Sequence, residues 1–221
     1  MGAQTQEVFG RDSGKLVEAY LMTMNQGSIN IGRMLETLEI VLDESIETNV
    51  RLGQLVAQHE PTQYTEIGCG LGIPSLTLEK LGYASDSTFD KSRGRVDLGK
   101  QLARSLGLHR TKYEVKNFRY WYPTMHAGSF LVAHNPAGEG SNGDLEVDVL
   151  ELAIARNYNL ALVPRPNLDE SLRELSPRCR AESSLLKREE RYCSRLRESG
   201  YNVKVHDIGI IVPANVIIAV K

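Results

Sequence analysis

Three closely spaced glycines and two carboxylates are the residues of this 221-residue chain whose spacing best suits the binding of a ligand. The segment TEIGCGLGI spans residues 65–73, between a short apolar run and a stretch with helical periodicity. Gly68, Gly70 and Gly72 permit positive φ angles and carry no Cβ, so a ligand can approach the backbone and the N–H groups of a helix start. In an open α/β sheet, the first turn of this kind lies beside the crevice where ligands bind.

The glycine spacing differs from the dinucleotide fingerprint G-x-G-x-x-G, because the third glycine comes one residue early and position 73 is Ile. The observed form, E-x-G-x-G-x-G with Glu66 two residues before Gly68, resembles motif I of the class I S-adenosylmethionine-dependent methyltransferases. Asp90 lies 22 residues after Gly68, at the end of the next apolar run. A carboxylate at this place can accept hydrogen bonds from both hydroxyls of a free ribose. The alternative is an unrelated Rossmann-like domain whose glycines only shape a turn.

The resemblance extends over residues 64–221 and implies S-adenosyl-L-methionine as the cofactor. After the third strand, the family places a polar residue on the adenine amino group and an apolar residue against the adenine ring. After the fourth strand, it places groups around the methyl group and the amino-acid end of the cofactor. The cofactor-binding residues that the resemblance implies are Glu66, Gly68, Cys69, Gly70, Gly72, Asp90, Lys91, Asn117, Phe118 and His134.

The candidate catalytic residues, His134, Asn135 and Glu139, follow the fourth apolar run. Methyl transfer mainly requires that donor and nucleophile be aligned, and the amide oxygen of Asn135 can accept an N–H of an amine and leave its lone pair free. The sequence N-P-A-G from Asn135 resembles only the start of the N-P-P-aromatic motif of enzymes that methylate planar nitrogens. His134 and Glu139 are candidate bases. The structural alternatives are a turn capped by Asn135, a solvated Glu139 and a strand-end histidine.

The candidate substrate-binding residues are Tyr20, Trp121 and Asn135. Trp121 is the only tryptophan and lies in the segment RYWYP at residues 119–123, whose rings can line an acceptor pocket or pack a connection between elements. Tyr20 belongs to N-terminal helices that resemble the caps of small-molecule methyltransferases. A position in the ordinary core is the alternative for Tyr20.

The periodicity of the chain predicts an α/β fold. Residues 1–60 show helical spacing, with a break at residues 25–28 and a third helix over residues 48–59. From residue 64 onward, short apolar runs alternate with helical stretches, and the last two runs can pair only antiparallel. We expect an N-terminal helical cap over residues 1–60. We expect a Rossmann-like domain over residues 61–221, with a seven-stranded mostly parallel sheet, helices on both faces and a terminal antiparallel strand pair.

The overall charge gives no general attraction to polyanions, because 26 Lys and Arg oppose 28 Asp and Glu. Basic residues between positions 173 and 197 alternate with glutamates, as on a solvated helix face, so a nucleic-acid partner is less favoured than a small molecule. Three cysteines without a disulfide or zinc pattern, and no secretory signal, predict a cytoplasmic protein. We expect neither a membrane span nor a metal site, and the sequence leaves a homodimer open.

Together these features predict an enzyme, an S-adenosylmethionine-dependent methyltransferase that acts on a small-molecule acceptor, with nitrogen slightly preferred over oxygen. The alternatives are an RNA or protein methyltransferase and a non-catalytic nucleotide-binding module.

Overall fold

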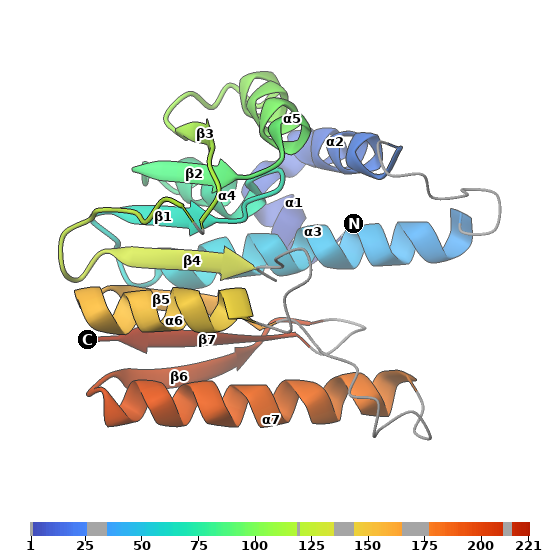
Figure 1. Cartoon of the computed structure of the whole chain (residues 1–221). Coiled ribbons are helices and arrows are strands. Elements are labelled where there is room, and N and C mark those ends of the chain that lie inside the picture. The colour runs from blue at the N-terminus through green and yellow to red at the C-terminus, as the bar shows by residue number, and fades with distance from the viewer. Residues whose placement is uncertain (1, 26–34, 119, 135–143, 165–176, 210–213) are drawn as a thin grey trace. The chain divides into compact units, whose positions relative to one another are not determined.

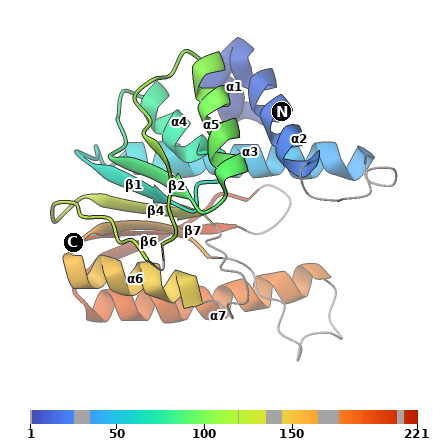
Figure 2. The same ribbon diagram turned by 45° about the horizontal axis from the view of Figure 1, so that its top comes forward.

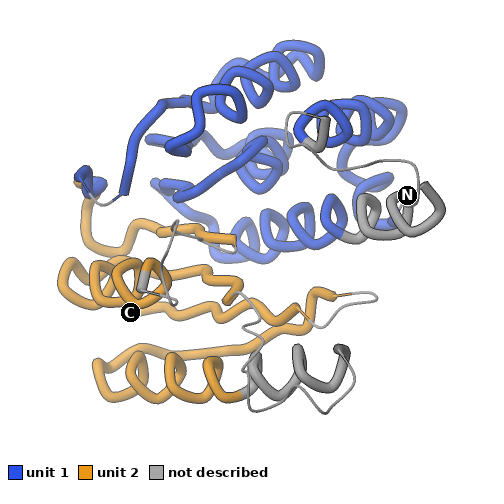
Figure 3. The backbone as a smooth tube through the Cα atoms, turned by 45° about the vertical axis from the view of Figure 1, so that its right-hand side comes forward, with its two compact units in different colours: residues 1–123 blue, residues 124–221 orange. Residues whose placement is uncertain are grey.

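The computed structural model describes residues 2–25, 35–118, 120–134, 144–164, 177–209 and 214–221; of residues 24–25, 35–44, 144 and 177–186 it describes only the backbone. The chain divides into two compact units, residues 1–123 and residues 124–221 (Figure 3). Residues 1–60 therefore belong to the same compact unit as the first three strands. The predicted division into a cap and a Rossmann-like domain at residue 60 stays a prediction.

The described residues form seven strands, whose order is β3-β2-β1-β4-β5-β7-β6 (Figure 1). The first unit contains a parallel set, and the second contains one parallel and two antiparallel pairings. The predicted α/β class, with a mostly parallel sheet and a terminal antiparallel pair, is confirmed. The strands are β1 (Tyr64–Ile67), β2 (Ser87–Asp90), β3 (Tyr113–Val115), β4 (Phe130–His134), β5 (Asn159–Val163), β6 (Asn202–Asp207) and β7 (Asn215–Val220).

The burial of the strands explains why the sequence predicts their positions. All four residues of β1 and of β2, and all five of β5, are buried, as expected for parallel strands with covered faces. Strand β6 ends the strand order, and all six of its residues are exposed or half-buried.

The helices of the first unit differ from the prediction near the N-terminus. A single helix, α3, runs through residues where the sequence predicted two helices, because no glycine or proline interrupts residues 35–52. The helices of the first unit are α1 (Ala3–Phe9), the 3₁₀ helix η1 (Gly10–Asp12), α2 (Ser13–Asn25), α3 (Leu35–Ala57), α4 (Ile73–Lys80) and α5 (Arg93–Ser105). The helices of the second unit are α6 (Asp144–Arg156) and α7 (Pro177–Glu198). Among the described helices, none combines the length and the apolar character that a membrane crossing requires.

In the first unit, the N-terminal helices pack on the two crossover helices. Helix α3 packs against α4 and α2 packs against α5 (Figure 2). Leu16, Ile46, Leu76 and Leu102, one from each of these helices, lie in a common apolar cluster. Helices α3 and α4 approach closely at Gly53, where a Cβ would lie 2.7 Å from the Cβ of a threonine on α4 and 2.9 Å from a backbone oxygen.

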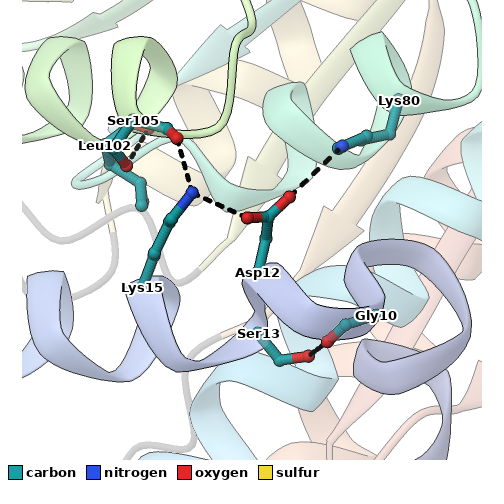
Figure 4. Close-up of polar contacts among 7 residues, drawn as sticks. All are labelled: Gly10, Asp12, Ser13, Lys15, Lys80, Leu102 and Ser105. Carbon is teal, nitrogen blue, oxygen red and sulfur yellow. Dashed lines mark hydrogen bonds and ion pairs between the residues drawn. The ribbon is translucent and has the colours of Figure 1, made fainter.

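Polar contacts fasten α2 to the crossover helices as well (Figure 4). The Lys15 ammonium group donates to the Asp12 carboxylate and to the Ser105 carbonyl at the end of α5, both at 2.7 Å. The second oxygen of Asp12 lies 3.9 Å from the ammonium group of Lys80 on α4. A cation near the C-terminus of α5 is also favourable to the dipole of that helix.

The carboxylate of Glu79 on α4 holds the loop that precedes β3. It accepts hydrogen bonds from the backbone amides of His109, Arg110 and Thr111 at 2.7–2.8 Å, and from the Thr111 hydroxyl at 2.6 Å. Burial alone would raise the pKa of Glu79, but these hydrogen bonds hold it below its ordinary value of 4.5. The loop is therefore ordered around one ionised side chain.

Glu79→Gln should lower the free energy of unfolding by about 2–4 kcal/mol, because backbone donors then meet an amide group instead of a carboxylate. The loss should shrink below about pH 4.5, where the wild-type carboxylate itself gains a proton. Urea unfolding at several pH values measures both effects. Glu18→Gln, at an exposed position of α2, is the matched control and should change stability by less than about 0.5 kcal/mol; equal losses in the two variants would contradict the role of Glu79.

Candidate functional site

The glycine segment forms the turn between β1 and α4 in the first unit. Gly68, Gly70 and Gly72 have φ angles of 65°, 55° and 72°, which is the left-handed region that glycine occupies without strain. The turn is tied to the next strand, because the Cys69 amide donates to the Phe89 carbonyl at 3.0 Å. The sequence therefore placed this segment correctly, at the carboxyl end of the first strand.

The three glycines have two different functions. A Cβ on Gly68 or Gly70 would have no described atom within 4 Å, so these two residues face open space. A Cβ on Gly72 would lie 2.6 Å from the hydroxyl oxygen of Tyr113. The first two glycines thus leave room for a ligand, whereas the third leaves room for a buried side chain of the protein.

Tyr113 on β3 supports the glycine turn from behind. Its hydroxyl donates to the Leu71 carbonyl at 2.7 Å, and its ring lies between Gly72 and Gly99. A Cβ on Gly99 of α5 would lie 2.6 Å from the ring and 2.9 Å from the Leu71 oxygen. Tyr113 and Gly99 are not among the predicted site residues, because no spacing along the chain links them to the motif.

Glu66, the acid of the motif, is buried under the start of α4. Its carboxyl group accepts hydrogen bonds from the Ser75 amide at 3.1 Å and from the Ser75 hydroxyl, which also contacts the Thr88 hydroxyl at 2.8 Å. Burial raises the pKa of Glu66 to about 8; the hydrogen bonds from Ser75 oppose this shift, and the nearby charge of Asp90 adds to it. The carboxyl group of Glu66 therefore holds a proton over most of the neutral range.

The start of α4 is poor in free donors for a phosphate group. Pro74 has no N–H group, and the Ser75 amide is already hydrogen-bonded to Glu66. A pyrophosphate at a helix N-terminus depends on such amides. Positions 74 and 75 of the helix start therefore offer no free amide to a pyrophosphate.

Asp90 at the end of β2 joins three elements of the site. One carboxylate oxygen accepts from the Gly70 amide at 3.0 Å, and the other accepts from the Ser92 amide, ahead of α5, at 2.8 Å. Each carboxylate oxygen has a second acceptor position. Asp90 can therefore hold the turn and also accept hydrogen bonds from a ligand.

Aromatic rings follow β3 in the first unit. The Phe118 side chain is 5% exposed, and Tyr122 meets it edge-on with the ring centres 5.3 Å apart. Trp121 meets Phe89 edge-on at 4.9 Å, and the Lys116 ammonium group lies 3.6 Å from the centre of the indole ring. The Trp121 ring thus packs on its own unit, and its role in substrate binding stays a prediction.

The other predicted residues of the first unit differ in exposure. Cys69 is buried beside Glu66 and Asp90; burial first, and then these two acids, raises the pKa of its thiol well above the ordinary value. Asn117 and Lys91 are exposed, and Tyr20 is half-buried against the apolar cluster. The structure therefore brings together the glycines, Glu66, Cys69 and Asp90. The role of each predicted residue in binding a cofactor or a substrate stays a prediction.

None of the three predicted catalytic residues belongs to the first unit. His134 ends β4 in the second unit, where burial lowers the pKa of its imidazole to about 4, so the ring is uncharged near pH 7. Asn135 and Glu139 lie outside the described residues. Within the described part of the chain, no three His, Cys, Asp or Glu side chains are grouped so that they could hold a metal ion.

Comparisons with known proteins support the fold. No family model matches the chain, and no curated protein matches its sequence. The magnesium protoporphyrin IX methyltransferase of Synechocystis PCC 6803 with bound SAH is 12% identical and superposes with a TM-score of 0.56, covering 96% of this chain and 95% of that chain. The chain has the class I methyltransferase fold. The predicted fold family is thereby confirmed.

Two further structures share this methyltransferase fold. The ribosomal protein L11 methylase of Lactobacillus delbrueckii subsp. bulgaricus is 13% identical, with a TM-score of 0.51, over 78% of this chain and 77% of that chain. The tRNA (uracil-54, C5)-methyltransferase of Pyrococcus abyssi, in complex with S-adenosyl-L-homocysteine, is 12% identical, with a TM-score of 0.50, over 78% of this chain and 38% of that chain.

Glu66→Gln should change how stability depends on pH. In the wild type, the folded chain holds the Glu66 proton up to about pH 8, whereas the unfolded chain loses it near pH 4.5, so stability falls as pH rises between these values. Glutamine imitates the protonated carboxyl group and can accept both Ser75 hydrogen bonds. The difference in melting temperature, variant minus wild type, should therefore increase from pH 5 to pH 8 by several degrees; a difference independent of pH would contradict the raised pKa.

Gly72→Ala should destabilise the fold more than Gly68→Ala does. Both substitutions place a Cβ at a positive φ, at a cost of about 1 kcal/mol, but only the Gly72 variant collides with the Tyr113 ring. We expect losses of about 3 kcal/mol and about 1 kcal/mol in the free energy of unfolding, measured by urea denaturation. Equal losses in the free energy of unfolding would show that the Tyr113 ring is not the reason why position 72 requires a glycine.

Proposed function

We propose that the chain is an S-adenosylmethionine-dependent methyltransferase whose cofactor binds at the glycine turn of the first unit. The observation that carries this proposal is the combination of open space beside Gly68 and Gly70 with the buried carboxyl groups of Glu66 and Asp90. The relatives of this fold named above, two of them with SAH or S-adenosyl-L-homocysteine bound, support the same cofactor.

The donor set fits an adenosyl sulfonium compound better than a dinucleotide. A ribose diol needs an acceptor, which Asp90 supplies, and the same carboxylate is compatible with a sulfonium cation. A pyrophosphate would instead be repelled by the Asp90 carboxylate and would find neither Pro74 nor Ser75 offering an amide. The spacing of the glycines in the sequence argues in the same direction.

The residues of this chain have separate tasks in the proposed reaction. When bound, S-adenosylmethionine would supply a methyl group that the nucleophile of an acceptor can attack, with S-adenosylhomocysteine as the leaving group. Asp90 would bind the ribose, while its hydrogen bond with Gly70 fixes the turn against which the cofactor lies. Asn117 and Phe118 would contact the adenine, and Tyr113 holds the turn in place from within the unit. Orientation of this kind can contribute about 7–11 kcal/mol to rate acceleration.

The identity of the methyl acceptor depends on other residues than the cofactor does. The sequence favoured a small molecule with an acceptor nitrogen, on the basis of Asn135, Glu139 and the helical N-terminus. The names of the proteins with this fold include a porphyrin, a ribosomal protein and a tRNA. Among the described residues, the surface charges of the first unit bear most directly on the acceptor.

Asp90→Asn should weaken the binding of S-adenosylhomocysteine by tenfold or more, which corresponds to about 1.4 kcal/mol. The substitution keeps the size of the side chain but turns one acceptor into a donor. Isothermal titration calorimetry on folded protein measures the affinity, and Asp97→Asn on the exposed side of α5 is the matched control. Equal affinity in the Asp90 and Asp97 variants would remove Asp90 from the site. Tight binding without methyl transfer to any acceptor in an extract would favour a non-catalytic nucleotide-binding module.

A further inference from the structure

Positive charge is concentrated in one segment of the first unit. Residues 91–119 contain nine Lys and Arg against two Asp and Glu, whereas the rest of the chain contains 17 against 26. The segment comprises α5, β3 and their flanking residues. The near-zero net charge of the whole chain therefore hides a strongly basic region.

Four cations on α5 have no acidic partner among the described residues. Arg93, Arg95 and Arg104 are exposed and Lys100 is half-buried, and none of the four lies within 4 Å of a described carboxylate oxygen. Asp97 is the only acidic residue of the helix. Like charges on neighbouring turns of one helix repel each other and lower the stability of the fold. Arg93 and Arg95 in the first turn also interact unfavourably with the helix dipole.

The basic residues of α7 show a different arrangement, although the sequence drew attention to them first. Arg188 pairs with buried Glu146 at 3.0 Å, and Arg195 makes two hydrogen bonds to Glu151 at 2.8 and 2.9 Å. These cations fasten α7 to α6 within the second unit. The cations of α5 have no such structural explanation.

The N-terminal end of α5, which carries Arg93 and Arg95, adjoins the proposed cofactor site. Helix α5 begins three residues after Asp90, and the charge of Arg95 is close enough to act on the thiol of Cys69 in the glycine turn. Strand β3 packs against α5, and the segment after β3 carries two exposed rings. Tyr120 is 87% exposed and Tyr122 is 54% exposed.

We propose that the four cations of α5, together with Tyr120 and Tyr122, form a docking surface for single-stranded nucleic acid. Unpaired Lys and Arg side chains suit a phosphate backbone, and the exposed aromatic rings on the segment that follows β3 suit unstacked bases. This inference rests on the proposed function, since the bound strand would carry the methyl acceptor. It selects the RNA alternative of the sequence analysis over the small molecule.

Binding of a fluorescein-labelled, unstructured RNA of about 20 nucleotides tests the inference by anisotropy from about 50 to 200 mM salt. A variant with glutamine at all four α5 cations should bind at least tenfold more weakly and should lower the slope of log affinity against log salt by about 3. The control carries the same change of charge on exposed residues of the second unit: Arg156→Gln, Lys187→Gln, Arg197→Gln and Lys204→Gln. It should bind RNA within about twofold of the wild type.

Tyr120→Ser tests the aromatic part of the surface, because this side chain is too exposed to affect folding. It should weaken RNA binding about fivefold or more without changing the salt slope. Equal loss of RNA binding in the α5 variant and the control would overturn the inference. Equal binding of polyglutamate and RNA to the wild type would also overturn it, and would favour an acidic polypeptide as the partner of this surface. Binding of S-adenosylhomocysteine is measured on the same proteins. If the wild type does not bind this compound, the proposed function is refuted. If the α5 variant loses RNA binding but still binds S-adenosylhomocysteine, the docking surface is supported.

Discussion

The hydrogen bond between the Gly70 amide and the Asp90 carboxylate is the interaction on which the candidate site depends. It holds a turn with three left-handed residues against the end of β2, and the same carboxylate fixes the entry to α5 through Ser92. Tyr113 completes the support by filling the space that Gly72 and Gly99 leave empty. The site is therefore held from two sides by groups that contact the backbone of the turn, and Gly68 and Gly70 are left open for a ligand.

The local features of the fold could be predicted from the sequence because burial marks them directly. The strands β1, β2 and β5 are short apolar runs whose residues are buried throughout, and the glycine turn follows the first of them. Asp90 was predictable as well, because it ends the next buried strand, 22 residues after Gly68. The separate third helix expected over residues 48–59 was wrong, because no glycine or proline interrupts residues 35–52 and one helix, α3, runs through them.

The contacts between distant segments could not be predicted in this way. Tyr113 and Gly72 are 41 positions apart in the sequence, and nothing in the motif indicates that its third glycine accommodates a tyrosine ring. The difference between the basic residues of α5 and α7 is of the same kind. Both helices are rich in Lys and Arg, but only the structure shows that Arg188 and Arg195 are paired with glutamates while the cations of α5 are not.

The central claim is that the glycine turn binds an adenosyl cofactor, and a comparison of ligands tests it most directly. Thermal unfolding of the wild-type chain would be followed with S-adenosylmethionine, S-adenosylhomocysteine and NAD, each at a concentration far above the expected dissociation constant. A ligand at about 100 times its dissociation constant adds about 2.7 kcal/mol, which raises the melting temperature by several degrees. The account predicts this rise with the two adenosyl sulfur compounds and none with NAD; a rise with NAD alone, or with none of the three, would contradict it.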